Sequence, residues 1–434
     1  MRAFSANTIY KDNNFQDEDI GDEMKTVIIV GGGAAGMMAA VKAAEHKANV
    51  ILLEKMPSLG RKVLITGKGR CNITNDCDTQ QLIKNMPGNG RFLHSAFREF
   101  SNTDMVEFIE HWGVKTKVER GGRVFPVSDK AKDVIDAFLK AMVKSRVEVI
   151  TNQPVRKILV EDGQVAGVVT DQKQYRADVV ILATGGASYP GTGSSGDGYK
   201  MAKELGHSIT PLKPSLVPLE VAEDWIKELQ GLSLKNVTAT VLIDGKKKAD
   251  DFGEMLFTHY GLSGPIILSL SKVVAEALNK GKEEVTLEIN LKPALSEEVL
   301  DKRIQRDWEK FSRKQVKNSL SELLPAKMIP VIIDLSFLDA DKFVNQVTKV
   351  ERARLLNQLQ HLAFTITRTR PVSEAIVTAG GVSTKEINPT TMESKIIKNL
   401  YFAGEVIDID GYTGGYNLQA AFSTGYAAGK AAAE

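Results

Sequence analysis

The chain is poor in the residues and segments that mark secreted, membrane and metal-binding proteins. Its 434 residues include two cysteines and six histidines. Two cysteines are too few for a disulfide framework or a cysteine-rich metal site, so a reducing, cytoplasmic compartment is expected. The histidines lack a metal-ligand spacing such as H-E-x-x-H, and no metal is implied. No apolar run reaches the roughly 18 residues that a membrane helix needs, so no membrane association is expected.

An excess of one charge is also missing. Lysine and arginine number 56, aspartate and glutamate number 54, and the formal net charge is +2. This balance neither demands nor excludes nucleic acid as a partner. The length exceeds that at which a single hydrophobic core usually stops growing, which predicts two or three domains. Residues 1–23 are polar and acidic without periodicity, and we interpret them either as an N-terminal tail or as the result of an upstream start, with Met24 then the native start.

Residues 27–55, "VIIVGGGAAGMMAAVKAAEHKANVILLEK", have the pattern of a strand, a tightly packed helix and a second strand. Gly31, Gly33 and Gly36 form G-x-G-x-x-G between the first strand and the helix, and Glu54 closes the second strand. The glycines allow a tight turn, an approach to pyrophosphate and close helix packing, while the acid binds a ribose. The unit predicts a dinucleotide site, whose further contact residues are Ala34, Ala35 and Lys55.

The C-terminal end of the chain favours FAD over NAD. Residues 399–405 form a strand that ends in Glu405, and a second glycine-rich helix start follows. FAD needs such a second contact because its ribityl chain and isoalloxazine extend beyond the first unit. Glu405 can bind a ribityl hydroxyl, amides near Asn417 and Leu418 can face the flavin N1/O2 edge, and the helix start stabilises reduced flavin. The neighbouring residues assigned to FAD are Gly404, Gly414, Gly415 and Tyr416.

Four segments resemble a known family. They are "GRKVLITGKGRCNITN" (60–75), "ATGGASYPGTGSSGDGY" (183–199), "GEMLFTHYGLSGPIIL" (253–268) and "YFAGEVIDIDGYTGGYNLQAAFSTG" (401–425). They are similar to signatures of the YhiN/BaiN-like NAD(P)/FAD-dependent oxidoreductases, and the resemblance runs from Met24 onward. The 183–198 segment is more distantly similar to fumarate reductases and aspartate oxidases.

Pattern and resemblance together predict the architecture. The strand and helix signals indicate a nucleotide domain with a two-part insertion, an antiparallel sheet or barrel followed by a mostly helical part. The resemblance implies an α/β fold in which a Rossmann-like FAD-binding domain of the glutathione-reductase type is interrupted by a β-barrel-like domain and a small helical domain. The expected boundaries are 24–207 and 361–434 for the FAD-binding domain, 208–293 for the barrel and 294–360 for the helical domain.

A basic loop follows the ribose-binding acid. Arg61, Lys62, Lys68 and Arg70 can reach FAD phosphates or an anionic substrate, and a solvated loop is the alternative. The resemblance places this loop beside FAD. The other residues that we assign to the cofactor are Thr66, Gly67, Gly69, Asn72, Val155, Ala183, Thr184, Gly185 and Gly186.

Three residues are candidates for catalysis. Cys71 lies beside Arg70, which can lower its pKa and make it a proton donor, whereas a packed inert thiol is the alternative. A disulfide with Cys77 is disfavoured because "CNITNDC" is one residue longer than the C-x4-C of disulfide reductases. Tyr189 precedes a glycine-rich loop, and His259 lies in the inserted segment; each is either a donor near the flavin or a structural residue.

The resemblance implies reduction of a carbon–carbon double bond conjugated to a carbonyl, as in bile-acid enones and in uridine of large ribosomal RNA. Flavin N5 would deliver a hydride, with NAD(P)H or another reductant as the electron source. We favour a uridine of 23S ribosomal RNA over a small unsaturated carbonyl compound. One alternative is a fumarate-reductase-like enzyme that binds a dicarboxylate through Arg368, Arg370 and His259. The other is a non-enzymatic, FAD-stabilised binding protein.

The insertion also carries basic residues. Phosphate contacts are one interpretation, and a solvated helix face is the other, because acidic residues are interleaved with them. The residues concerned are Lys246, Lys247, Lys248, Lys302, Arg303, Arg306, Lys310, Arg313 and Lys314.

Overall fold

The computed structural model describes residues 24–281 and 284–434, so the tail expected over residues 1–23 lies outside the described part. The chain divides into two compact units. The first unit comprises Met1–Lys213 and Val377–Glu434, and the second comprises Pro214–Ile376. Within the described ranges, no helix combines the length and apolar character that crossing a membrane requires.

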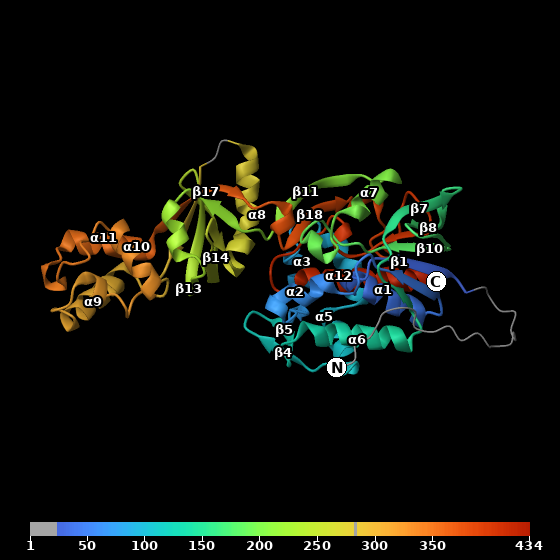
Figure 1. Cartoon of the computed structure of the whole chain (residues 1–434), viewed down its shortest axis with the longest axis horizontal. Helices are drawn as coiled ribbons and strands as arrows, with labels where there is room; N and C mark the ends of the chain where they lie inside the picture. Colours follow the sequence, from blue (N-terminus) through green and yellow to red (C-terminus); the bar gives the residue numbers. More distant parts are fainter. Residues whose placement is uncertain (1–23, 282–283) are drawn as a thin grey trace. The chain divides into compact units, whose positions relative to one another are not determined.

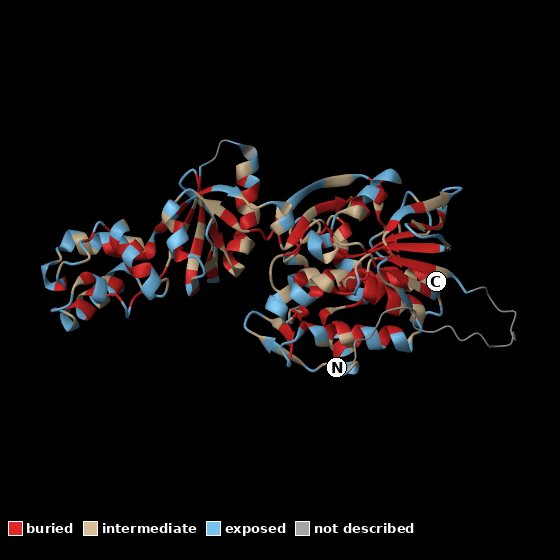
Figure 2. Cartoon of the chain, in the orientation of Figure 1, coloured by how far each residue is buried: buried red, intermediate tan, exposed pale blue. Residues whose placement is uncertain are grey.

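The first unit is built on a five-stranded sheet with the order β19-β10-β1-β2-β6, in which all neighbours are parallel (Figure 1). Its strands β1 and β10 are almost entirely apolar and buried, as expected for a parallel sheet covered on both faces (Figure 2). The strands are β1 (Thr26–Val30), β2 (Asn49–Leu53), β6 (Glu148–Ile150), β10 (Val179–Leu182) and β19 (Leu400–Phe402).

Smaller elements surround this sheet. Two three-stranded antiparallel sheets are β3 (Thr74–Asn75), β5 (Arg123–Pro126) and β4 (Thr116–Glu119), and β7 (Val155–Glu161), β8 (Gln164–Thr170) and β9 (Gln174–Arg176). A further pair is β11 (Ile209–Ser215) and β18 (Val377–Val382). The helices are α1 (Ala34–Glu45), α2 (Arg61–Ile65), α3 (Thr79–Lys84), α4 (His94–Glu99), α5 (Asn102–His111), α6 (Ala131–Lys144), α7 (Asp197–Glu204) and α12 (Tyr416–Ala433).

The first and last helices of this unit, α1 and α12, pack against each other through small residues. A Cβ on Gly425 would lie 2.3 Å from the Ala35 carbonyl oxygen, and one on Gly429 would lie 2.4 Å from the Ala39 carbonyl oxygen. Only glycine therefore allows the two backbones this approach. The contact joins the N-terminal βαβ unit to the C-terminal end of the chain.

The second unit contains a closed barrel with the strand order β12-β15-β14-β13-β16-β17. Its strands are β12 (Leu219–Val221), β13 (Ser233–Ile243), β14 (Lys246–Phe257), β15 (Gly261–Ser263), β16 (Val285–Asn290) and β17 (Leu362–Thr369). Strand β17 falls within the segment 361–434, and it closes the barrel by pairing with β12 and β16. The predicted α/β class, with a Rossmann-type sheet and an inserted barrel, is confirmed.

Helices lie on either side of the barrel strand β16 in the sequence and share one core with the barrel. They are α8 (Pro265–Lys280), which precedes β16, and α9 (Glu297–Lys310), α10 (Ile329–Leu335) and α11 (Lys349–Gln360), which follow it. Leu300 and Ile304 of α9 and Leu359 of α11 are fully buried together with barrel residues such as Ile289 and Leu362. The backbone of Leu291 donates a hydrogen bond of 2.9 Å to the Leu359 carbonyl, which ties the helices to the barrel.

We expect Gly429→Val to lower the free energy of unfolding by about 3 kcal/mol, because the new side chain collides with α1 backbone that cannot move independently of the sheet. Thermal unfolding followed by circular dichroism measures this change. Lys430→Val is the matched control, since this half-buried position places the same side chain one residue further along α12 and removes only its ion pair with Glu99. Equal stabilities of the two variants would contradict the proposed packing.

Candidate functional site

The glycine-rich turn lies between β1 and α1, at the carboxyl edge of the parallel sheet. Gly31 has φ of 107°, and its N–H donates a hydrogen bond of 2.8 Å to the Leu53 carbonyl. A Cβ here would lie 2.5 Å from the Ala183 carbonyl oxygen, and one on Gly36 would lie 1.8 Å from the Gly31 carbonyl oxygen. Both positions therefore require glycine. On Gly33, by contrast, a Cβ would meet no heavy atom within 4 Å, so this side of the turn is open.

Glu54 follows β2 and is held next to the turn. One carboxylate oxygen accepts a 2.7 Å hydrogen bond from the N–H of Gly32, and the other accepts a 2.7 Å hydrogen bond from the N–H of Met56. Gln153 donates from its backbone to the Glu54 carbonyl at 2.9 Å, which brings the start of β7 at Val155 close to this acid. Ala34 and Ala35, in the first turn of α1, are buried behind the glycines.

A second set of predicted residues meets the first at the same edge of the sheet. The segment 183–186 follows β10, and a Cβ on Gly404, which follows β19, would lie 2.8 Å from the Cβ of Ala35. Lys55 forms a 2.5 Å ion pair with Asp197 at the start of α7. Residues separated by more than 350 positions in the sequence thus surround one turn.

Lys62 and Glu405 form a partly buried ion pair of 2.7 Å. Lys62 also donates to the Ser188 hydroxyl at 2.6 Å. The other carboxylate oxygen of Glu405 accepts from the Thr378 N–H at 2.8 Å and from the Ser188 hydroxyl at 3.2 Å. A carboxylate has about four lone-pair positions, so Glu405 retains capacity for one further donor such as a ribityl hydroxyl.

The start of α12 lies against the loop that contains the basic residues. A Cβ on Gly415 would lie 2.4 Å from the Thr74 carbonyl oxygen, and Asn75 donates to the Gly414 carbonyl at 3.0 Å. The Asn417 side chain is used within its own loop, where it accepts from the N–H of Gly411 and donates to its carbonyl. Tyr416 and Leu418 occupy the first turn of α12.

Three predicted cofactor residues carry buried polar atoms without a hydrogen-bond partner among the described residues. These atoms are Nε of Arg61, Oδ1 of Asn72 and Oγ1 of Thr184. Unsatisfied buried polar groups are costly, so their presence in the segments around the open turn indicates a polar ligand. A dinucleotide fits this donor and acceptor set. The loop between Arg61 and Asn72 adopts left-handed conformations at Gly67 and Gly69, which shape its backbone.

Arg70 is engaged by the protein itself. Its guanidinium lies 2.9 Å from Glu119 and 3.4 Å from Asp129, and it stacks over the Phe125 ring at 4.1 Å. The Thr66 hydroxyl, in the same loop, donates to the Val63 carbonyl at 2.7 Å. Arg70 therefore holds the loop in place through its contacts with Glu119, Asp129 and Phe125.

Of the two interpretations given for Cys71, the one with a lowered pKa is wrong. Cys71 is fully buried, and burial raises the pKa of its thiol to about 12, against a smaller lowering by a hydrogen bond with Thr66. Arg70, next in sequence, is turned toward Glu119 and Asp129 and does not compensate. Cys71 and Cys77 are both free thiols. The interpretation as a packed thiol is the one that this burial favours.

The other two catalytic candidates lie in different units. Tyr189, in the first unit, is half-buried with φ of 52°, next to Ser188 of the Lys62–Glu405 network. A positive φ at a non-glycine residue is strained and is enriched at functional sites. His259 is exposed in the turn after β14 in the second unit, where its ring contacts Tyr260 edge-on at 4.8 Å.

Arg368 and Arg370, the candidates for binding a dicarboxylate, are neutralised within the second unit. Glu220 accepts hydrogen bonds of 2.6 Å from both arginines. Arg370 also forms a bidentate pair with Glu374 and lies over the Tyr260 ring at 4.6 Å. Both guanidinium groups are therefore paired with carboxylates of the chain itself.

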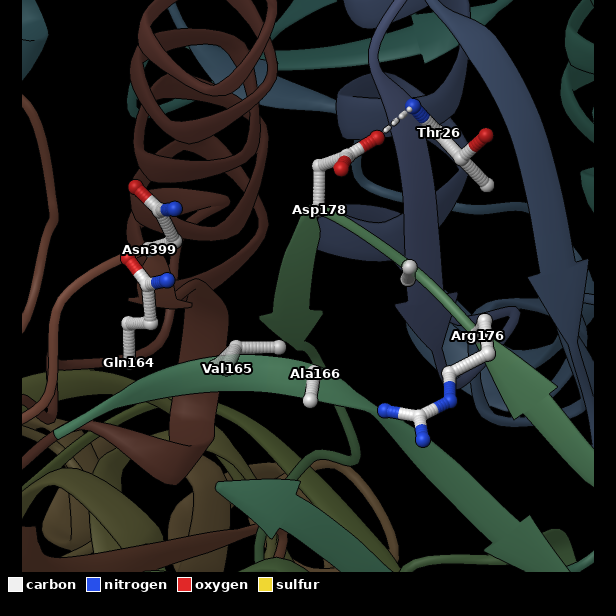
Figure 3. A pocket seen from close by; sticks show the side chains of 8 residues that line it. Thr26, Gln164, Val165, Ala166, Arg176, Asp178 and Asn399 are labelled. Atoms are coloured by element: carbon white, nitrogen blue, oxygen red, sulfur yellow. Dashed lines mark hydrogen bonds between the residues drawn. The ribbon is translucent and has the colours of Figure 1, made fainter. Parts of the chain in front are cut away.

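A surface hollow in the first unit lies at the opposite, amino edge of the parallel sheet (Figure 3). Its lining includes Thr26 at the start of β1, Asp178 immediately before β10 and Asn399 immediately before β19. Asp178 accepts a 2.8 Å hydrogen bond from the Thr26 N–H, as Figure 3 shows. Ligands of open parallel sheets bind at the carboxyl ends of the strands, so this amino-edge hollow is not the dinucleotide site.

Two residues of the site were missed from the sequence. Thr378 joins the network by donating from its N–H to Glu405 and accepting at its hydroxyl from the N–H of Ala187 at 2.9 Å. Asp197, which forms the ion pair with Lys55, is the other. The glycine pair Gly380 and Gly381, close after Thr378, indicates a strand with irregular backbone. No spacing rule, however, relates this strand to the other segments of the site, so the sequence gives no reason to place Thr378 there.

These features define a dinucleotide-binding protein of the Rossmann type. A family model described as "HI0933-like protein Rossmann domain" matches residues 25–431, and the chain belongs to this family. A 3-dehydro-bile acid delta(4,6)-reductase of Clostridium scindens is 33% identical over 95% of this chain and 100% of that protein. A ribosomal RNA dihydrouridine synthase of Haemophilus influenzae is 31% identical over 92% of this chain and 96% of that protein.

A solved structure shows the same fold. The 3-ketosteroid-delta4-(5alpha)-dehydrogenase of Rhodococcus jostii superposes with a TM-score of 0.52 at 15% identity, covering 96% of this chain and 98% of that one. The fold and the family agree with the expectation from the sequence. The chain is a flavoprotein oxidoreductase, and the predicted family resemblance is confirmed.

We expect Thr184→Val to weaken FAD binding by about tenfold while the FAD-free protein unfolds at the same or a higher temperature. The hydroxyl has no described partner, so its removal relieves a desolvation cost in the free protein and loses a hydrogen bond in the complex. Titration of the apoprotein with FAD and thermal unfolding measure the two effects. Thr378→Val is the control, because its hydroxyl already accepts a protein hydrogen bond and its loss should destabilise both forms. Unchanged FAD affinity in Thr184→Val would contradict the assignment.

Proposed function

We propose that the chain reduces a carbon–carbon double bond conjugated to a carbonyl, and that its substrate is a uridine of 23S ribosomal RNA, which becomes dihydrouridine. One observation carries the proposal: relatives named for two such reductions each align over nearly the whole chain. A uridine and a 3-oxo steroid diene share an alkene polarised by a carbonyl. Both accept a hydride at the β-carbon and a proton at the α-carbon.

FAD, when bound, supplies the hydride at N5, and NAD(P)H is the proposed source of the two electrons. The residues of the chain hold and orient this cofactor. We assign the pyrophosphate to the Gly31–Gly36 turn and the ribose to Glu54. The Lys62–Glu405 pair and the start of α12 are assigned to the ribityl and isoalloxazine end.

The proposal favours uridine over the fumarate-reductase-like alternative. A dicarboxylate needs free cations, and Arg368 and Arg370 are committed to Glu220 and Glu374. A small enone remains the second candidate substrate. The full-length similarity to the bile acid reductase supports it.

Deletion of the gene from its host should remove one dihydrouridine from 23S ribosomal RNA, because the proposed enzyme for that base is then missing. Mass spectrometry of nuclease fragments measures the loss as a 2 Da decrease, which is the mass of the two hydrogens added to the alkene. Wild-type chain should restore the modification, and Gly31→Val, which collides with Ala183, should not. Unchanged ribosomal RNA, together with turnover of a 3-oxo steroid alkene by the purified chain, would support the second candidate instead.

Tyr189 is our proposed proton donor, because it adjoins the Lys62–Glu405 network and holds a strained backbone. We expect Tyr189→Phe to slow alkene reduction about 100-fold, within the range for loss of a general acid. Reduction of the flavin by NAD(P)H, which needs no proton from this residue, should keep its rate. Stopped-flow absorbance separates the two half-reactions, and Tyr175→Phe, on β9, is the control. Equal slowing of both half-reactions would argue for a structural role.

A further inference from the structure

Positive charge is concentrated in one short segment of the second unit. Residues 302–317 contain seven lysines and arginines and two acidic residues, a formal charge of +5, whereas the whole chain carries +2. The rest of the chain is therefore negative on balance. The segment comprises the second half of α9 and the turn after it, shown at one end of the unit in Figure 1.

The helix presents this charge on one face. Leu300, Ile304 and Trp308 recur every four residues and are buried, so they form the core side of α9. Arg303, Arg306 and Lys310 recur at intervals of three and four, so they form a second, basic stripe along the helix. Figure 2 shows the outward side of these helices exposed.

Carboxylates of the chain neutralise part of this stripe. Asp307 is buried and lies 3.5 Å from Arg303 and 3.4 Å from Arg306. Lys310 forms a 2.8 Å ion pair with Glu322. In contrast, Lys302, Arg313 and Lys314 are exposed and form no ion pair with any residue between 24–281 or 284–434.

Aromatic rings are interleaved with these cations. Phe311 follows α9 directly, and its ring centroid lies 4.9 Å from the Lys310 ammonium and 4.1 Å from the Lys314 ammonium. Phe343, whose backbone bridges to Gln315 beside this turn, is 46% exposed. An aromatic ring held between cations offers a nucleobase a stacking surface and the adjoining phosphates a counter-charge.

We propose that this surface, which we term the α9 platform (residues 302, 303, 306, 310, 311, 313, 314 and 343), binds the phosphates and unpaired bases of ribosomal RNA. The inference rests on the proposed function and adds the place where the substrate RNA is held. A purely solvated helix face would need neither the half-buried Phe311 between two cations nor the exposed Phe343 beside it. Clustered cations around aromatic rings match the repeating phosphate and base of a single strand.

The test uses the full chain with FAD and unmodified 23S ribosomal RNA made by transcription. The variant Lys302→Gln/Arg313→Gln/Lys314→Gln removes the three cations that lack an ion pair. Each lost phosphate contact in a single strand lowers the slope of log affinity against log salt by about 0.7, so we expect a slope smaller by about 2 and about 50-fold weaker binding at 0.15 M salt. Filter binding across a salt series measures both.

The matched control is Lys47→Gln/Lys130→Gln/Lys140→Gln, which removes the same charge from exposed positions of the first unit and should leave binding near wild type. Phe311→Leu should weaken binding about tenfold without a change in salt slope, because it removes a stacking ring and no charge. Circular dichroism and flavin content should be unchanged in all variants, which separates a binding defect from misfolding.

Two outcomes distinguish this proposal from the function on which it rests. If wild-type chain forms dihydrouridine while the α9 platform variant binds 23S ribosomal RNA with wild-type affinity and slope, the platform is overturned and the function stands. If the wild-type chain itself neither binds nor modifies the RNA, both are overturned. Weaker binding and a smaller slope confined to the platform variant support the proposal.

Discussion

Close approach of backbone segments at the carboxyl edge of the parallel sheet is the constraint on which this structure depends. Gly31 faces the Ala183 carbonyl, Gly36 faces the Gly31 carbonyl, and Gly425 faces the Ala35 carbonyl, each at a separation that excludes a Cβ. These contacts bring together the first βαβ unit, the loop after β10 and the final helix. Without them the segments that surround the dinucleotide would not share one edge.

The same convergence of segments places two carboxylates, Glu54 and Glu405, in the site. Glu54 is held by two backbone N–H groups and Glu405 by Lys62, Thr378 and Ser188, so both carboxylates are fixed before a ligand arrives. Preorganisation of this kind lowers the ordering cost of binding. The unsatisfied polar atoms of Arg61, Asn72 and Thr184 are further groups that a polar ligand can hydrogen-bond.

The two units divide the work. The first unit carries the dinucleotide site, and in our proposal the second supplies the surface that holds a macromolecular substrate. Arg368 and Arg370 show that the position of a residue in the fold can rule against the role that the sequence suggests. In the sequence they resemble an anion site, yet in the barrel they are bound to Glu220 and Glu374 and stabilise the unit itself.

Local patterns in the sequence determined the β1–α1–β2 turn, the acid at its end and the second glycine-rich helix start, because glycine spacing and hydrophobic periodicity act over a few residues. The strand pattern left an antiparallel sheet or a barrel open for the insertion, and the family resemblance favoured the barrel and assigned the central loops. Tertiary structure alone decided which charges are free: it buried Cys71 and raised its pKa, turned Arg70 toward Glu119, and joined Lys62 to Glu405 across 343 positions. Burial and long-range pairing depend on segments that no local pattern relates, so only the folded chain fixes them.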